Sequence, residues 1–423
     1  MATLTRRNIV LAGLALTALG ITGCSDADPG TVLKGGAARR QPGTPQEVAA
    51  TELTSFSVRL MSQTFTPDKN LVASPLSVAI ALSLTRNGAQ GDTATQMDRV
   101  LGAADLGSWN QSMNTTMATL ASRTGEYPAG DDKVRVIVEL ANAIWSDKSI
   151  VPEAAFLDAL AEYYGAGVAT ADFKNDLNRA VKAINGWAKK NTHDLIPEIL
   201  KREALPEDPR MVLVNTVYLK AAWLIPFSKG GTSIQPFTKG DGSQARVPTM
   251  QAGTGSWFED ATCQATSIPY AGNKLAMAVA LPKSTPQRLL TSWAQGGLSN
   301  LLNKMTGETV QLSMPRWSFN SDQALKDALT QLGMPLAFSD LADFSAMTRS
   351  EGLKIGQVFH GAKISVNEAG TEAAAATAVV MLPISGAANP RALRLDRPFC
   401  FAIYDIELKV PLFLGVVVDP SAN

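Results

Sequence analysis

The chain has 423 residues, of which 45% are hydrophobic and 18% are charged, a composition that suits a folded globule and excludes wholesale disorder. Lysine plus arginine and aspartate plus glutamate number 38 each, so no charge excess predicts nucleic acid or an anionic polymer as a partner. The length allows one large domain or two to three smaller ones.

The first residues differ in kind from the rest of the chain. The basic start with Arg6-Arg7 resembles a twin-arginine export signal, and a short apolar segment from Val10 to Ile21 follows it. The following Ile21-Thr22-Gly23-Cys24 resembles a bacterial lipobox. Because the apolar segment is short for a bilayer span, residues 1–23 are predicted to be a signal peptide; an unmodified signal peptide and a retained anchor helix are the alternatives. Cleavage before Cys24 would leave that cysteine to carry lipid.

The next stretch, residues 24–47, is rich in glycine, proline and alanine and is predicted to tether the domain to a membrane. The expected location is therefore the cell envelope, as a lipoprotein, or the outside of a bacterial cell. Cys263 and Cys400 each lie in an apolar, strand-like run, where buried free thiols are more common than a disulfide.

The N-terminal part of the domain begins with helical periodicity. Apolar residues recur at helical spacing from Val48 to Phe65. A short strand at 70–73 then leads to Ser74-Pro75 and a helix that is apolar on most sides, with Ser74 as its cap. The hydroxyls of Ser74 and Ser77 at this buried helix start need hydrogen-bond partners.

The middle of the chain alternates between helical and strand patterns. The continuous apolar run from Met211 to Phe227, which includes Trp223, predicts a central strand that is covered on both faces. Other predicted helices are a polar helix within 110–130, followed by a loop from Pro128, then Pro152–Tyr164, a helix ending near Lys190, and Asp322–Leu332. Other predicted strands are Val134–Trp145, Val247–Met250, Cys263–Pro269, Leu275–Leu281 and Val310–Pro315. No linker-like break interrupts residues 50–420.

The stretch from Val366 to Ser385 is unusual. It starts as an alternating strand and becomes a run of small residues from Gly370 to Ala378. Alanine is the best helix former, so a helix is one interpretation. The other interpretation is a segment that can adopt two conformations: a loop in solvent, or a strand inserted between two strands of a sheet. In the inserted strand, larger side chains would clash with the packed layers. In such a strand Thr371 faces the core and Glu372 faces away.

This stretch, Asn367-Glu368-Ala369-Gly370-Thr371-Glu372-Ala373-Ala374-Ala375-Ala376-Thr377, resembles the hinge of the reactive-centre loop of inhibitory serpins. Other segments match family landmarks in the family's order: Asn70–Leu84, Asn87–Met97, Leu140–Trp145, Leu395–Ile403 and Pro411–Gly415. The resemblance implies one α+β domain at 48–423, with three sheets, about nine helices and a reactive-centre loop at about 368–394.

The resemblance also implies roles for individual residues. The hinge comprises Glu368, Gly370, Thr371, Glu372, Ala373, Ala374, Ala375 and Ala376. The region of the main sheet that opens to admit the loop comprises Ser74, Ser77, Asn215 and His360, with Trp223 where the loop first enters.

A count from Glu368 locates the bond that a protease would cut. In inhibitory serpins the residue before this bond is usually the seventeenth from the hinge glutamate, which is Ile384, so the predicted reactive bond joins Ile384 to Ser385. Met381, Leu382 and Pro383 make the neighbouring bait apolar, which predicts an elastase-like, subtilisin-like or chymotrypsin-like target. The segment from Ser385 to Arg397 is longer than in many relatives, so the count from Glu368 locates the cleaved bond only to within a few residues.

The implied activity is suicide inhibition of a serine protease through a covalent acyl complex. The alternatives are a non-inhibitory binding or scaffold lipoprotein of the same fold and an inhibitor of cysteine proteases. Enzyme activity is not expected: a hydrolytic triad needs a histidine, and His193 lies in a polar stretch while His360 lies in a strand. No cofactor or metal set is predicted. The stretch before Lys133 holds only Arg123 as a basic residue, so no glycosaminoglycan is expected, and the protein is expected to be a monomer.

Overall fold

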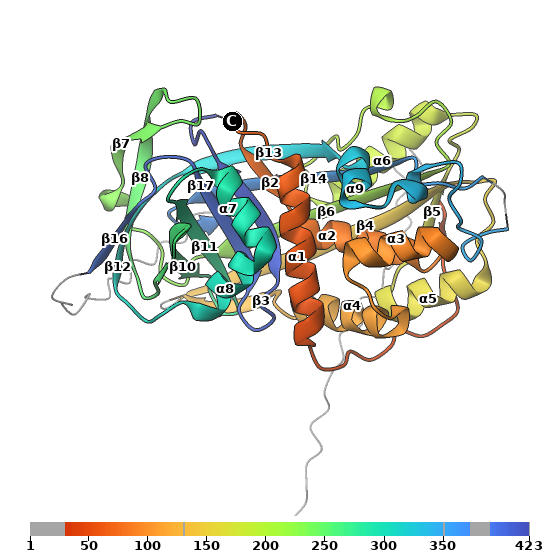
Figure 1. The fold of residues 1–423 in the computed structure, drawn as a ribbon, viewed down its shortest axis with the longest axis horizontal. Coiled ribbons are helices and arrows are strands. Elements are labelled where there is room, and N and C mark those ends of the chain that lie inside the picture. Colours follow the sequence, from red (N-terminus) through yellow and green to blue (C-terminus); the bar gives the residue numbers. More distant parts are fainter. Residues whose placement is uncertain (1–29, 130–131, 350–351, 373–389, 423) are drawn as a thin grey trace, which may run out of the picture.

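The structure is a computed structural model, and it describes residues 30–129, 132–349, 352–372 and 390–422. Three sheets and the helices packed on them form an α+β domain (Figure 1). The helices are α1 Glu47–Thr64, α2 Pro75–Arg86, α3 Gly91–Leu101, α4 Leu106–Ala121, α5 Ala154–Tyr164, α6 Leu177–Asn191, α7 Pro286–Ser292, α8 Leu298–Lys304 and α9 Lys326–Leu332.

The largest sheet has eight strands in the order β1-β5-β4-β6-β15-β14-β13, with β3 paired to β4 outside this path. Its strands are β1 Val32–Leu33, β3 Gly125–Ala129, β4 Asp132–Asp147, β5 Val168–Ala171, β6 Met211–Ala222, β13 Trp317–Ala324, β14 Gln357–Asn367 and β15 Gly370–Thr371. β6 is central, as its apolar run predicts, since it pairs with β4 on one edge and with β14 and β15 on the other.

Two smaller sheets complete the fold. One has the order β2-β18-β17-β11-β10-β9, formed by Leu71–Ala73, Pro411–Val417, Phe399–Asp405, Leu275–Pro282, Cys263–Pro269 and Phe258–Glu259. The other has the order β16-β12-β8-β7, formed by Arg391–Arg394, Val310–Pro315, Gln244–Thr254 and Ser233–Thr238. Cys263 and Cys400 lie in the six-stranded sheet as buried, free thiols, and burial raises the pKa of Cys263 to about 12.

Both faces of the large sheet are covered, so β6 alternates between two cores. Val212 and Val214 pack with α6 in one hydrophobic cluster, whereas Leu213 and Val217 pack with α1, α2 and the larger cluster on the opposite face. Helix α2 is buried along nearly its whole length because it lies beneath the sheet. The Ser74 side chain caps it and Pro75 is its first residue, as the sequence predicts.

Three segments differ from the sequence predictions. Residues 125–129 form strand β3 in place of the predicted loop start, and Pro128 lies on this short strand. The helix predicted from Asp322 begins only at Lys326, because Trp317–Ala324 is a strand paired along its whole length with β14.

The third segment is the part of the predicted tether that the structure describes. Residues 32–33 add strand β1 to the edge of the large sheet, against β5. Farther along, Arg40 bonds to Glu162 and Gly43 bonds to Thr115, so this stretch packs along α5 and α4 before α1 begins. Within the described residues, no helix combines the length and hydropathy needed to cross a membrane.

Candidate functional site

The candidate site lies where β6 and β14 separate. These parallel strands pair directly from Val212↔Gln357 to Thr216↔Gly361. Beyond that point β15 lies between them: Thr371 is paired with Val366 of β14 on one side and with Ala221 of β6 on the other. The stretches 217–220 of β6 and 362–365 of β14 therefore have no strand between them among the described residues. The hinge has begun a new strand at the far end of this interval.

Gly370 is required by the close approach of the hinge to β6. Its φ is +153°, and a Cβ at this position would lie 2.1 Å from the carbonyl oxygen of Ala221. The next residue, Thr371, is only 2% exposed, and its hydroxyl shares a hydrogen bond of 2.6 Å with the hydroxyl of Tyr270. Burial raises the pKa of Tyr270, so this phenol stays protonated. A bulky or charged side chain in place of Thr371 would have to displace this contact.

Trp223 holds the turn that leads into β15. Its indole N–H donates to the carbonyl of Asn367, and its backbone N–H donates to the carbonyl of Ala369, both at 2.9 Å. The ring stacks on Tyr270 with 4.5 Å between centroids and 13° between planes. Trp223 and Tyr270 together therefore form the contact surface for residues 367–371.

Glu368 anchors the hinge on its other side. The residue is only 5% exposed, and its carboxylate accepts hydrogen bonds from the Arg316 guanidinium, at 2.8 Å from Nε, and from the Thr232 hydroxyl. Burial alone would raise the pKa of Glu368, but these bonds outweigh it and hold the pKa below its usual value. A buried, paired carboxylate of this kind fixes the start of the hinge against the residues that directly precede β13 and β7.

Glu372 is the last hinge residue before 373–389. It is half-buried, and its backbone N–H donates to the carbonyl of Ser365 on β14. Burial raises the pKa of its carboxyl, a rise that the charges of Lys363 and Lys220 oppose. The predicted hinge residues Ala373, Ala374, Ala375 and Ala376, the bait Met381, Leu382 and Pro383, the bond Ile384-Ser385 and the lipid-bearing Cys24 all lie outside the described residues.

The four residues assigned from the resemblance to the opening of the sheet lie together, where β6 and β14 still pair. The backbone N–H of Ser74 donates to Nε2 of His360 at 2.8 Å, and Nδ1 of His360 bonds to Oδ1 of Asn215. Asn215 Nδ2 in turn donates to the carbonyl of Phe359 at 3.2 Å. Ser77 joins through its N–H, which donates to Ser74 Oγ at 3.4 Å. This network ties the start of α2 to both strands.

Four functional partners were not found from the sequence. Asn142 of β4 accepts from Ser77 Oγ at 3.0 Å, and Tyr270, Arg316 and Thr232 contact the hinge as described above. Each lies far along the chain from its partner, for example 101 residues between Tyr270 and Thr371. No local pattern marks any of the four.

Three sheets in this arrangement, with a hinge that enters the largest sheet between two parallel strands, define a serpin-type fold. A family model described as Serpin (serine protease inhibitor) matches residues 51–420, and the chain belongs to this family. Serpins are generally protease inhibitors rather than enzymes. The α+β architecture with three sheets is confirmed by this match and by the solved structures that share it.

Individual relatives come from different domains of life. An uncharacterized serpin-like protein of Thermococcus kodakarensis is 32% identical over 376 residues, which cover 87% of this chain and 85% of the relative. Plasminogen activator inhibitor 1 of Sus scrofa is 31% identical over 387 residues, covering 89% and 93%. The crystal structure of tengpin, a thermophilic serpin, in the native state is similar with a TM-score of 0.80 and 28% identity, covering 92% of this chain and 97% of that one.

The His360 network makes the folded protein sensitive to acid. Burial lowers the pKa of His360 to about 4, because a charged ring is disfavoured away from water, and the hydrogen bond with Asn215 only partly opposes this. The unfolded chain, with an ordinary pKa near 6.5, binds this proton first as the pH falls. The stabilisation is therefore complete above about pH 6.5 and is lost toward pH 4, by about 3 kcal/mol in total.

We expect the free energy of unfolding, measured by urea titration at pH 7.5 and 4.5, to fall less over this range in His360→Gln than in the wild type. His193→Gln is the matched control, since His193 is about half exposed on the surface beside Glu139, and it should keep the wild-type fall. An equal fall in all three proteins would show that His360 does not carry the effect.

Proposed function

We propose that the protein is a suicide-type inhibitor of serine proteases. The observation that carries this proposal is the position of Gly370 and Thr371 as the first residues of a strand between β6 and β14. Strand formation has begun at the end where the reactive-centre loop would enter. After Glu372 the sequence continues with four alanines, Ala373 to Ala376, whose side chains would fit between two packed layers without displacing them.

In the proposed mechanism the serine Oγ of the protease attacks the carbonyl carbon of Ile384. The bond to the Ser385 nitrogen breaks, Ser385 leaves with a free amino group, and Ile384 remains bound to the protease as an acyl ester. The freed segment then extends β15 between β6 and β14 and carries the protease with it. Each new backbone hydrogen bond stabilises the inserted form by about 0.5–1.5 kcal/mol, so insertion along both edges gains on the order of ten kcal/mol.

The apolar bait determines the proposed targets. Ile384 and its neighbours Met381, Leu382 and Pro383 suit a protease with a medium-sized hydrophobic specificity pocket, so elastase-like, subtilisin-like and chymotrypsin-like enzymes are the proposed class. The test is a denaturing gel of the protein mixed with elastase, subtilisin, chymotrypsin or trypsin. A detergent-resistant complex with one of the first three, and a released peptide that begins at or near Ser385 by mass spectrometry, supports the proposal.

Thr371→Arg should convert the inhibitor into a substrate. The arginine cannot occupy the buried position against Tyr270, so the loop is cut but not inserted. On the same gels the covalent complex should fall at least tenfold while the cleaved chain accumulates. Val151→Arg, at a position that is 73% exposed, is the control and should trap the protease normally. Undiminished trapping by Thr371→Arg would contradict insertion from this residue.

Cleavage near Ile384 should also stabilise the protein against heat. Because the inserted strand adds hydrogen bonds and buried area, the nicked form should melt about 20 °C or more above the intact form. Scanning calorimetry of intact and nicked protein, with nicked Thr371→Arg as the control that should rise less, measures this. A nicked wild type that melts no higher than the intact protein would point to the non-inhibitory alternative.

We further propose that the protein is exported and anchored through lipid on Cys24, as a cell-envelope lipoprotein. The support is the sequence pattern Ile21-Thr22-Gly23-Cys24 after a short apolar segment. In a bacterial host that processes lipoproteins, labelled palmitate should enter the wild type and Cys263→Ala but not Cys24→Ala. Equal labelling of all three proteins, or of none, would overturn the anchor.

A further inference from the structure

Part of the outer edge of β4 carries no neighbouring strand. At one end the N–H of Val138 donates to Thr124 Oγ1 at 2.9 Å, and at the other end β5 begins to pair at Ile144. Backbone groups alternate between the two edges of a strand, so Leu140 and Asn142 direct their N–H and C=O groups to the same outer side as Val138. No described residue bonds to these four groups, and because Leu140 and Asn142 are partly exposed, the groups are accessible to a binding partner.

A groove of about 1410 Å³ lies beside this edge. We call it the β4 groove; Leu140 and Asn142 contribute to its lining, together with residues of α2, α4, α5, α6, β1 and β5. Small-molecule pockets usually measure about 300–1,000 Å³. The β4 groove is larger than this range and runs along a strand edge, so its dimensions suit an extended peptide better than a small ligand.

The two walls of the β4 groove differ in chemistry. On the α2 and α4 side the lining is apolar, with Ile80, Leu84 and Met117. On the α6 side it is cationic, because Arg179, Lys182 and Lys190 lie on one face of that helix. None of these three cations forms an ion pair with a carboxylate in the part of the chain that the structure describes.

The remaining charges around the groove leave the α6 wall positive. Asp176 is the carboxylate in its lining, and it is engaged as the cap of α6, accepting from the Arg179 N–H at 3.0 Å. Lys34 of the stretch after β1 adds a further positive charge to the lining. Gly186 of α6 borders open space on this wall, since a Cβ there would meet no atom within 4 Å.

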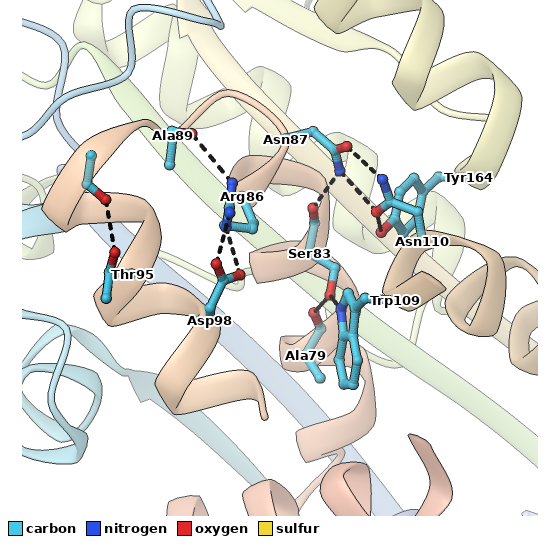
Figure 2. A network of polar contacts seen from close by, with 11 residues as sticks. Ala79, Ser83, Arg86, Asn87, Ala89, Thr95, Asp98, Trp109, Asn110 and Tyr164 are labelled. Carbon is cyan, nitrogen blue, oxygen red and sulfur yellow. Dashed lines mark hydrogen bonds and ion pairs between the residues drawn. The ribbon is translucent and has the colours of Figure 1, made fainter. Parts of the chain in front are cut away.

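A buried polar network connects the helices α2, α4 and α5 on the apolar side of the groove (Figure 2). The hydroxyl of Tyr164, a lining residue, donates to Asn110 Oδ1 at 2.6 Å, and Asn110 Nδ2 donates to Asn87 Oδ1 at 2.7 Å. Asn87 Nδ2 then donates to the carbonyl of Ser83 on α2 at 2.8 Å. These bonds join α2, α4 and α5, so the wall is formed before any ligand arrives, which lowers the ordering cost of binding.

We propose that the β4 groove binds an extended peptide segment of a partner protein in which acidic and apolar residues alternate. The peptide adds a strand to the outer edge of β4 and bonds to the backbone of Leu140 and Asn142, the mode known as β-strand addition. Successive side chains of a strand point to opposite faces. One set therefore meets Arg179, Lys182 and Lys190, and the other set meets Ile80, Leu84 and Met117. This site is separate from the hinge and does not depend on protease inhibition.

The test uses the full chain and a synthetic probe, an eight-residue, end-capped, fluorescent peptide of alternating glutamate and valine. Fluorescence anisotropy should show saturable binding. Lys182→Glu combined with Lys190→Glu should weaken it at least tenfold because both charges face the peptide. Lys229→Glu combined with Lys304→Glu makes the same charge change at exposed positions away from the groove and should alter the affinity less than twofold.

Two further peptides test the strand geometry without altering the protein. One has four glutamates followed by four valines, so it keeps the composition and charge but loses the alternation. The other is the alternating peptide with N-methyl groups on every second residue, on the set whose N–H groups would face β4. Both should bind at least tenfold more weakly than the probe. Equal binding of all three peptides would show that only non-specific charge attraction holds them, which would contradict strand addition. No binding of the probe would overturn the proposal.

Discussion

Two parallel strands of the large sheet, β6 and β14, hydrogen-bond to each other through only part of their length, and the rest of the site depends on what lies between them beyond that point. β15 occupies the far end of the interval with two residues. Among the described residues, stretches 217–220 of β6 and 362–365 of β14 have no strand between them. In the inhibitory function proposed above, growth of β15 into this interval would add backbone hydrogen bonds along both edges.

Opposing contacts keep this arrangement in place. At the end of the sheet that holds β15, Trp223 and Tyr270 contact the turn at 367–369 and the residues of β15. Arg316 and Thr232 bind Glu368 within this turn. Farther down, the buried network of Ser74, His360 and Asn215 joins α2 to both strands where they still pair. A buried polar network of this kind stabilises one packing arrangement only while every member has its partner. If one partner is lost, the others keep unsatisfied hydrogen-bonding groups in a place that water does not reach.

Much of the fold could be predicted from the sequence because its elements have strong local patterns. The continuous apolar run of β6 and the helical spacing of α1 are examples. The small-residue hinge, together with Ser74, Asn215 and His360, led to the candidate site through the resemblance. The partners that were missed, Tyr270, Arg316, Thr232 and Asn142, are joined to the site only by tertiary packing. Strand β13 was missed because its pattern runs directly into that of α9, and the packing of residues 30–46 follows from the surface they meet.

The stacking of Trp223 on Tyr270 gives the molecule an intrinsic optical reporter. The indole contacts the hinge turn through its own N–H group and is fully buried. Its emission depends on the polarity around the ring and on the aromatic neighbour beside it. Any event that withdraws residues 367–371 from the sheet, or drives them deeper, therefore changes a spectroscopic signal that is already built into the native chain.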